Sequence, residues 1–270
     1  MQDVTDRDFM ALVAQYGAPD FYITEYFRVY ANSRLDRHIL RAVTENATGR
    51  PVLAQLIGEH LPDLQRIAQE LQTYPIAGID LNLGCPAPRV YRKNVGGGLL
   101  REPETIERLL AGLRAVVHVP FTVKMRVGFA DLADFPQLLA TLARQGVDRV
   151  SLHGRTVKEG YRGTVRYEAI AQAVQALPCP VIANGNVDSA AKAGKVVALT
   201  GAAGVMIGRG AIANPWIFRQ TQEIWQGQPP YQPTYQEAYA YLQALAALAP
   251  PSAGEPRTVG PPQKIMPILS

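Results

Sequence analysis

The stretch Gly78-Ile79-Asp80-Leu81-Asn82-Leu83-Gly84-Cys85-Pro86 says most about the fold of this chain. Its first part continues an apolar run that begins at Ile76 and is typical of a buried strand. Gly84 and Pro86 then end the strand and turn the chain. A cysteine that only fills a core would lie inside the run, whereas Cys85 lies at the turn, where a side chain can face a ligand. The stretch therefore predicts a strand that places a thiol at its carboxyl end.

The same pattern recurs along the chain, since short apolar runs rich in β-branched residues alternate with segments of helical period. We expect strands at Asp20–Thr24, Val52–Leu56, Gly78–Leu83, Phe121–Met125, Arg149–Leu152, Val181–Ala183 and Gly204–Ile207. We expect helices at Phe9–Tyr16, Asp36–Val43, Leu61–Leu71, Glu104–Val117, Phe135–Gln145, Tyr167–Ala176, Ser189–Leu199, Pro215–Trp225 and Tyr235–Leu248. Strands separated by helices favour parallel pairing with right-handed crossovers.

These strands are one fewer than a closed (β/α)8 TIM barrel needs. Residues Met1–Asp6 read as a loop and a helix cap with no strand before them, so we predict a (β/α)8 TIM barrel whose first strand is missing. An open sheet of seven strands, with two exposed edges, is the alternative. We place the barrel at residues 1–226, the start of a C-terminal helical domain at 227–250, and a disordered tail at 251–270.

Composition excludes several classes of protein. The chain has 270 residues and is 47% hydrophobic, which is enough for one substantial core. No apolar run reaches the roughly 18 residues of a membrane helix, and no secretory signal is present. Cys85 and Cys179 lie far apart, so we expect free thiols in a reducing cytoplasm and interpret Cys179, between two prolines, as structural.

Charge and metal-ligating residues say less. Two cysteines and four scattered histidines show no familiar ligand spacing, so we expect no metal. The net charge of +4 and the pI near 9.1 permit a polyanionic partner without requiring one.

Reactive side chains follow the strands, at the end where a parallel barrel forms its active site. Lys124 stands between apolar residues of a strand, so we expect it to face the barrel interior and to need a polar or anionic partner. His153 precedes Gly154-Arg155-Thr156 at a strand end, where a functional histidine and a hydrogen-bonded core histidine are both open. The other residues of this kind are Gln55, Asn82, Cys85, Asn184, Gly185, Asn186, Gly208 and Arg209.

The last two strands suggest a phosphate site. Asn184-Gly185-Asn186 and Gly208-Arg209-Gly210 are glycine-bearing turns that lead into helices, where backbone N–H groups can surround a phosphate. Arg209 adds a charged donor. Such a site suits FMN, because the amide of Gln55 could pair with the pyrimidine edge of the flavin and Lys124 could stabilise negative charge on its N1–C2=O side.

Together these pieces resemble the tRNA-dihydrouridine synthase family. The matching motifs occur in the family's order over roughly residues 1 to 225. They are Met1-Gln2-Asp3-Val4-Thr5-Asp6, Gln55-Leu56-Ile57-Gly58, Asn82-Leu83-Gly84-Cys85-Pro86, Gly96-Gly97-Gly98-Leu99-Leu100, Lys124-Met125-Arg126, His153-Gly154-Arg155-Thr156, Asn184-Gly185-Asn186 and Gly208-Arg209-Gly210-Ala211. The resemblance implies FMN contacts at Met1, Gln55, Asn82, Lys124, His153, Asn184, Gly185, Asn186, Gly208 and Arg209.

The resemblance also implies a reaction. NADPH would reduce FMN, the flavin N5 would pass a hydride to C6 of a uracil in tRNA, and Cys85 would protonate C5. The base would have to leave its stack to reach the flavin. Candidate contacts to the tRNA backbone are Arg89, Arg92, Lys93 and Arg155.

Members of this family begin with a strand that ends in Ala-Pro-Met, of which only Met1 is present here, and carry a C-terminal helical bundle. We therefore expect a chain shortened at both ends, cytoplasmic and monomeric. Two alternatives remain open: an FMN barrel that acts on a free pyrimidine, of the dihydroorotate or dihydropyrimidine type, and an inactive fragment.

Overall fold

Seven parallel strands form one sheet in the order in which they occur along the chain. The computed structural model describes residues 4–248, so the predictions for Met1 and for the tail at 251–270 lie outside the described residues. The strands are β1 (Tyr22–Arg28), β2 (Val52–Ile57), β3 (Gly78–Leu83), β4 (Phe121–Arg126), β5 (Arg149–His153), β6 (Val181–Asn184) and β7 (Gly204–Met206).

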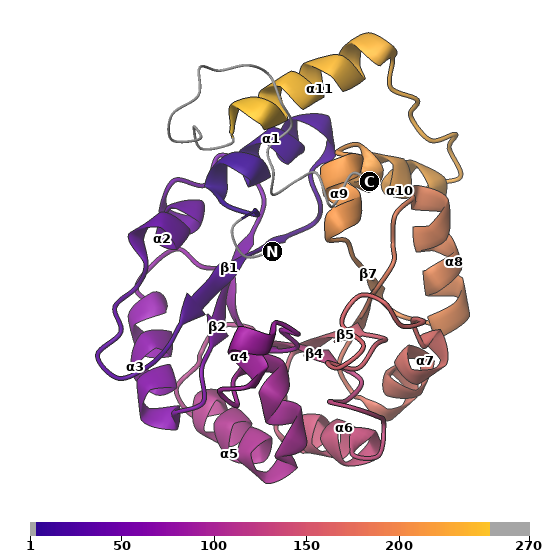
Figure 1. Ribbon diagram of the computed structural model, residues 1–270. Helices are drawn as coiled ribbons and strands as arrows, with labels where there is room; N and C mark the ends of the chain where they lie inside the picture. Colours follow the sequence, from indigo (N-terminus) through magenta and orange to yellow (C-terminus); the bar gives the residue numbers. More distant parts are fainter. Residues whose placement is uncertain (1–3, 249–270) are drawn as a thin grey trace.

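The sheet curls into a ring, which Figure 1 shows from one end. No pairing joins β7 to β1 in the described part of the chain, and we call this gap the open edge. The prediction of a TIM-barrel-like fold followed by C-terminal helices is confirmed, with seven strands and an open edge. β1 continues past the predicted end at Thr24 and ends at Arg28. A bulge between Ile23 and Tyr26 shifts its register with β2.

Helices surround the ring and match the predicted segments. They are α1 (Arg7–Gly17), α2 (Arg37–Thr44), α3 (Leu61–Leu71), α5 (Pro103–Arg114), α6 (Phe135–Arg144), α7 (Tyr167–Ala176), α8 (Ala190–Thr200), α10 (Ile217–Trp225) and α11 (Tyr235–Ala247). Three short segments were not predicted: α4 (Pro88–Tyr91), the 3-10 helix η1 (Gly96–Arg101) and α9 (Arg209–Ala213). Each is too short to show a helical period in the sequence. No described helix is long and apolar enough to cross a membrane.

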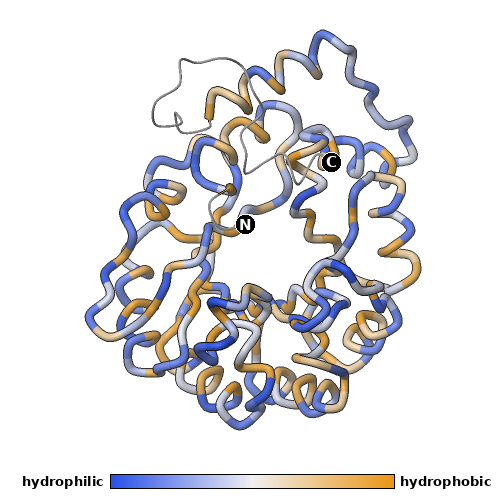
Figure 2. The backbone as a smooth tube through the Cα atoms, in the orientation of Figure 1, coloured by the Kyte–Doolittle hydropathy of each residue, from blue (hydrophilic) through white to orange (hydrophobic). Residues whose placement is uncertain are grey.

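The main core lies between the strands and the outer helices. Ile79 and Leu81 of β3 and Val123 of β4 are fully buried there. Hydrophobic and hydrophilic residues alternate along the outer helices (Figure 2). The buried apolar residues of these helices pack against those of the strands. Because side chains alternate along a strand, the polar residues between these core positions face the interior of the ring.

A second core lies beside the open edge, and we call it the edge cluster. Its buried members are Phe9, Leu12, Val13, Ile212, Trp216, Tyr241 and Leu245. They come from α1, α9, the turn before α10, and α11, which lie together on one side of the ring in Figure 1. The hydroxyl of Tyr241 donates to the carbonyl of Ile212 at 2.7 Å. Side-chain packing thus joins the first helix to the last, next to the edge where strand pairing is interrupted.

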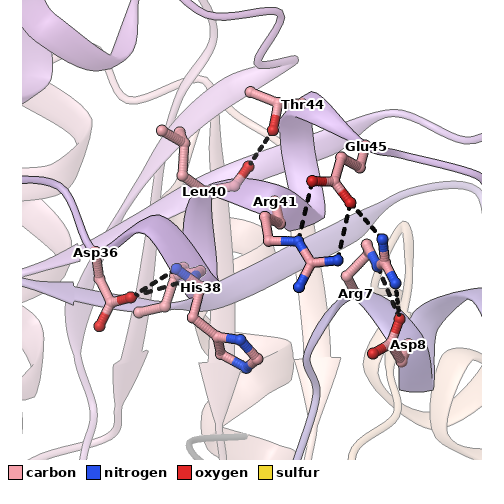
Figure 3. Close-up of polar contacts among 9 residues, drawn as sticks. Arg7, Asp8, Asp36, His38, Leu40, Arg41, Thr44 and Glu45 are labelled. Carbon is pink, nitrogen blue, oxygen red and sulfur yellow. Dashed lines mark hydrogen bonds and ion pairs between the residues drawn. The ribbon is translucent and has the colours of Figure 1, made fainter.

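Exposed ion pairs connect α1 to α2 (Figure 3). Arg7 of α1 contacts Glu45, which follows α2, and Arg41 of α2 donates to Glu45 at 3.0 Å. Asp36 caps α2 by accepting the N–H of His38 at 2.8 Å. Exposed pairs of this kind orient the two helices and add little to their stability.

Candidate active site

Neighbouring strands bring predicted site residues to the interior of the ring. In the parallel register, Asn82 of β3 pairs with Lys124 of β4. His153 of β5 pairs with Asn184 of β6. All four lie in the second half of their strands, so they gather toward the carboxyl end, where parallel barrels place their active sites.

A hydrogen-bonded chain of side chains crosses the floor of this site. The Nδ2 of Asn82 donates to Oε1 of Gln55 at 2.9 Å, and the Nε2 of Gln55 donates to Oδ2 of Asp80 at 2.7 Å. The hydroxyl of Thr122 donates to the other oxygen of Asp80 at 2.5 Å. Asp80 is 0% exposed, and this burial raises the pKa of its carboxyl, against the lowering effect of its two hydrogen-bond donors.

Asn82 also shapes the turn that carries the thiol. Its Oδ1 accepts the backbone N–H groups of Gly84 and Cys85, both at 3.0 Å. A Cβ on Gly97 of η1 would lie only 2.7 Å from the carbonyl oxygen of Cys85, so only glycine lets η1 approach the turn this closely. Cys85 itself is half-buried, with its backbone held from two sides.

Lys124 lies inside the ring and makes no hydrogen bond or ion pair with any described residue. Burial and the nearby Arg126 lower the pKa of Lys124 to about 8, while Asp80 and Cys85 act in the opposite direction. Asn82 is the register partner of Lys124 and holds the turn that carries Cys85, so the thiol and the ammonium lie at the same end of the ring. Lys124 is half-buried, and a cation that is partly removed from water without a partner is costly unless a ligand pairs with it.

His153 is buried and neutral. Its Nδ1 accepts the backbone N–H of Arg155 at 3.2 Å. Burial, followed by the charges of Arg126 and Lys124, lowers the pKa of His153 to about 2. The imidazole therefore carries its proton on Nε2, which makes it a neutral donor.

The two predicted phosphate turns lie side by side. A Cβ on Gly210 would lie 2.6 Å from the carbonyl oxygen of Val187, just beyond Asn186, so the turns after β6 and β7 contact each other. Gly185 and Asn186 both adopt positive φ, at 127° and 51°, in a conformation that glycine and asparagine tolerate best. The Nδ2 of Asn184 donates to the carbonyl of Met206 at 2.8 Å and links the two strand ends.

The structure separates the four predicted tRNA-contacting residues. Arg89, Arg92 and Lys93 are exposed on and just after α4, next to the Cys85 turn. Arg155 is only 3% exposed, and it donates to the carbonyl of Gly163 and, at 3.1 Å, to Asn186 Oδ1. It therefore braces the loop after β5 against the loop after β6.

Sequence reasoning missed two residues that the structure places in or beside the site. Asp80 lies two residues before Asn82 and so on the same face of β3, a spacing that could have identified it. Tyr161, 57% exposed, has the guanidinium groups of Arg126 and Arg209 at 5.6 and 4.6 Å from its ring centroid. No local pattern signals these contacts, because Tyr161 lies in the loop after β5, whereas Arg126 ends β4 and Arg209 begins α9.

Comparison with known proteins agrees with these features. Residues 1–250 match the family model described as dihydrouridine synthase (Dus). The chain is 34% identical to a tRNA-dihydrouridine(16) synthase of Cupriavidus necator, over 85% of this chain and 74% of that protein. It is 37% identical to tRNA-dihydrouridine synthase B of Pseudomonas aeruginosa, over 82% and 66% of the two chains. The corresponding protein of Vibrio cholerae is 38% identical, over 83% and 70%.

Among solved structures, N-(5'-phosphoribosyl)anthranilate isomerase from Pyrococcus furiosus aligns with a TM-score of 0.50 and 17% identity, over 81% of this chain and 92% of that chain. At this identity the likeness concerns the fold alone. The family is shown instead by the match along residues 1–250 and by relatives of which the chain spans between 66% and 74%. The chain is therefore a member of the dihydrouridine synthase family.

Proposed function

We propose that this chain reduces uridine in tRNA to 5,6-dihydrouridine, with FMN as cofactor and NADPH as reductant. The observation that carries the proposal is the position of Cys85, on a braced turn at the carboxyl end of β3, beside the register pair Asn82 and Lys124. The names of the relatives support tRNA as the substrate over a free pyrimidine. A cytoplasmic location and a monomeric state stay predictions.

The residues of the ring interior fit FMN. Lys124 is a cation without a protein partner among the described residues, which suits an anionic group, and the neutral His153 can only donate from Nε2. The glycine-bearing turns after β6 and β7 supply backbone N–H groups for a phosphate. We propose that the cofactor contacts Gln55, Asn82, Lys124, His153, Asn184, Gly185, Asn186, Gly208 and Arg209.

Bound FMN would supply the hydride for the uracil ring, replenished by NADPH. Cys85 would supply the proton that completes the reduction, from its Sγ to C5 of the base. Asn82 would keep the thiol in place by holding the backbone of its turn. Arg89, Arg92 and Lys93 would hold the RNA backbone while the base leaves its stack.

The test begins with the flavin spectrum of the purified protein, before and after addition of FMN. The protein is then incubated with NADPH and either tRNA that lacks dihydrouridine or free uridine. We expect yellow protein that forms dihydrouridine in tRNA only. Turnover of free uridine alone would favour the free-pyrimidine alternative, and colourless protein that does not take up FMN would favour the inactive fragment.

Cys85→Ala tests the role of the thiol, with Cys179→Ala as the matched control. We expect Cys85→Ala to retain FMN and to lose at least about 100-fold in rate, the range that general acid catalysis provides. Cys179→Ala should keep its activity, because Cys179 is remote from the site in Pro178-Cys179-Pro180. Equal rates for the two variants would remove Cys85 as the acid.

A further inference from the structure

We propose that Asp80 is a positioning residue whose carboxylate sets the direction of the hydrogen-bonded chain beneath Cys85. The inference rests on the proposed function only for the role of Cys85. The buried carboxylate lies at the end of the chain of side chains, and every donor in that chain points toward it.

The direction follows from what each group can do. Asp80 accepts at both carboxyl oxygens, from the Thr122 hydroxyl at Oδ1 and from the Gln55 amide at Oδ2, as a carboxylate without a proton does. This turns Gln55 Oε1 toward Asn82, which must then present its Nδ2. The amide of Asn82 is thereby fixed with Oδ1 toward the loop.

That orientation is the one the Cys85 turn requires. Both N–H groups of the turn, from Gly84 and Cys85, converge on Asn82 Oδ1 at 3.0 Å. If the amide of Asn82 were reversed, its NH₂ would face two N–H donors, and two hydrogen bonds would be lost. Asp80 thus acts on the thiol through two intervening amides.

A counter-ion role for Asp80 toward Lys124 is the competing explanation. Asp80 does favour the charged form of Lys124, but the two form no ion pair within 4.0 Å in the described structure. Both carboxylate oxygens are instead occupied by Gln55 and Thr122. Only the positioning role predicts that the Cys85 turn depends on whether residue 80 presents an acceptor atom to the Gln55 amide.

The first test uses the wild-type protein without cofactor. Hydrogen exchange of the peptide that spans Leu83–Pro88 reports almost only on this turn, because Pro86 and Pro88 have no N–H. We expect slow exchange at Gly84 and Cys85. Exchange at the rate of an unstructured peptide would overturn the proposal without any variant having to fold.

The second test measures the reactivity of Cys85 with 5,5'-dithiobis(2-nitrobenzoate), in a Cys179→Ala background so that one thiol reports. The plateau rate at high pH is compared, which separates access to the thiolate from a change in its pKa. Asp80→Leu removes both acceptor oxygens, so the Gln55 amide is no longer held in one direction. This variant should raise the rate by about fivefold or more, which is the effect of losing at least one of the two hydrogen bonds at the turn. Thr122→Val also removes a bond to Asp80 but leaves the chain's direction intact, so its rate should stay within about twofold of the wild type.

A double variant supplies the decisive comparison. In Asp80→Leu with Asn82→Asp, the new carboxylate at position 82 accepts from Gln55 and from both N–H groups of the turn, so the turn no longer depends on residue 80. We expect the plateau rate to return to the wild-type value. An unchanged rate in Asp80→Leu, an equal rise in Thr122→Val, or no recovery in the double variant would each overturn the proposal.

None of these measurements uses FMN, NADPH or tRNA, so a failure here leaves the proposed function intact, and absence of tRNA reduction leaves this proposal intact. If both hold, Asp80→Leu should lower kcat in the tRNA assay with KM for tRNA changed by less than about twofold, since the thiol and not the RNA contact is displaced.

Discussion

Asn82 of β3 and Lys124 of β4 are partners in the parallel register, and the turn held by Asn82 carries Cys85 to the same end of the ring. One side chain therefore organises a backbone, while its neighbour holds a positive charge that no residue of the described range 4–248 pairs with. The site therefore combines a thiol on a hydrogen-bonded turn with a neighbouring cation that is available to a ligand.

Lys124 should cost stability in the protein without cofactor. Its folded pKa of about 8 lies below the ordinary value of 10.5, so the fold disfavours the ammonium. Below pH 8 the cost is present in full, and it fades as the pH rises from 8 to 10.5. We expect Lys124→Met to raise the free energy of unfolding at pH 7 by up to about 3 kcal/mol, since a tenfold change in proton binding corresponds to about 1.4 kcal/mol.

Denaturant unfolding at pH 7 and at pH 10 measures this difference. Lys195→Met, on the exposed surface of α8, is the control and should change little. A Lys124→Met protein that is less stable than the wild type at pH 7 would contradict the prediction.

His153 should make the protein sensitive to acid. Its folded pKa of about 2 lies below the ordinary 6.5, so the fold disfavours the protonated ring. The stability that His153 supports is present above pH 6.5 and is lost as the pH falls below it, at about 1.4 kcal/mol per pH unit. His153→Gln should therefore lose stability less steeply than the wild type between pH 6.5 and 4.5, as followed by urea unfolding.

The exposed His118 provides the comparison for this effect. His118→Gln should show the wild-type dependence on pH. Parallel curves for His153→Gln and the wild type would mean that the ring of His153 is not buried as described.

Tyr241 should anchor α11 to the rest of the fold. Tyr241→Phe removes the hydroxyl that donates to Ile212 and leaves a buried carbonyl without its donor, at a cost of about 1–3 kcal/mol. Tyr239→Phe, on the same helix but 63% exposed, should stay within about 0.5 kcal/mol. Thermal unfolding of the two variants tests the edge cluster, and equal melting temperatures would argue against it.

Arg92 and Lys93 should contribute to RNA affinity through charge. Replacing either by alanine should weaken tRNA binding at low salt and lower the slope of log Kd against log salt by about 1. Lys195→Ala serves as the control on the outer helix α8, where no RNA contact is expected. Binding titrations between 50 and 200 mM salt, the range over which phosphate contacts weaken most visibly, give the slopes. A slope that is unchanged in both Arg92→Ala and Lys93→Ala would place the RNA elsewhere.

Local patterns predicted most of the fold. Each strand appears in the sequence as a short apolar run, and the long outer helices as a period, because their apolar faces pack in the main core or, for α1 and α11, in the edge cluster. The patterns could not show α4, η1 and α9, whose positions depend on contacts such as that between Gly97 and the Cys85 carbonyl. The extension of β1 was missed because its bulge and the buried Glu25 break the alternation.

The site was predicted less completely than the fold. Strand ends identify Cys85, Asn82 and Lys124, since parallel strands finish at one edge. Strand ends do not show which side chains are buried, and burial distinguishes Arg155 from the exposed Arg92. Nor can they give the direction of a hydrogen-bonded chain, which depends on side chains from three strands.

The edge cluster has a consequence for synthesis of the chain. Phe9 is translated long before its packing partners Trp216 and Tyr241. The apolar face of α1 therefore lacks these partners until α11 has been made. We expect nascent chains that end before α11 to expose this face to chaperones, and the folded protein to release α1 and α11 together when it unfolds.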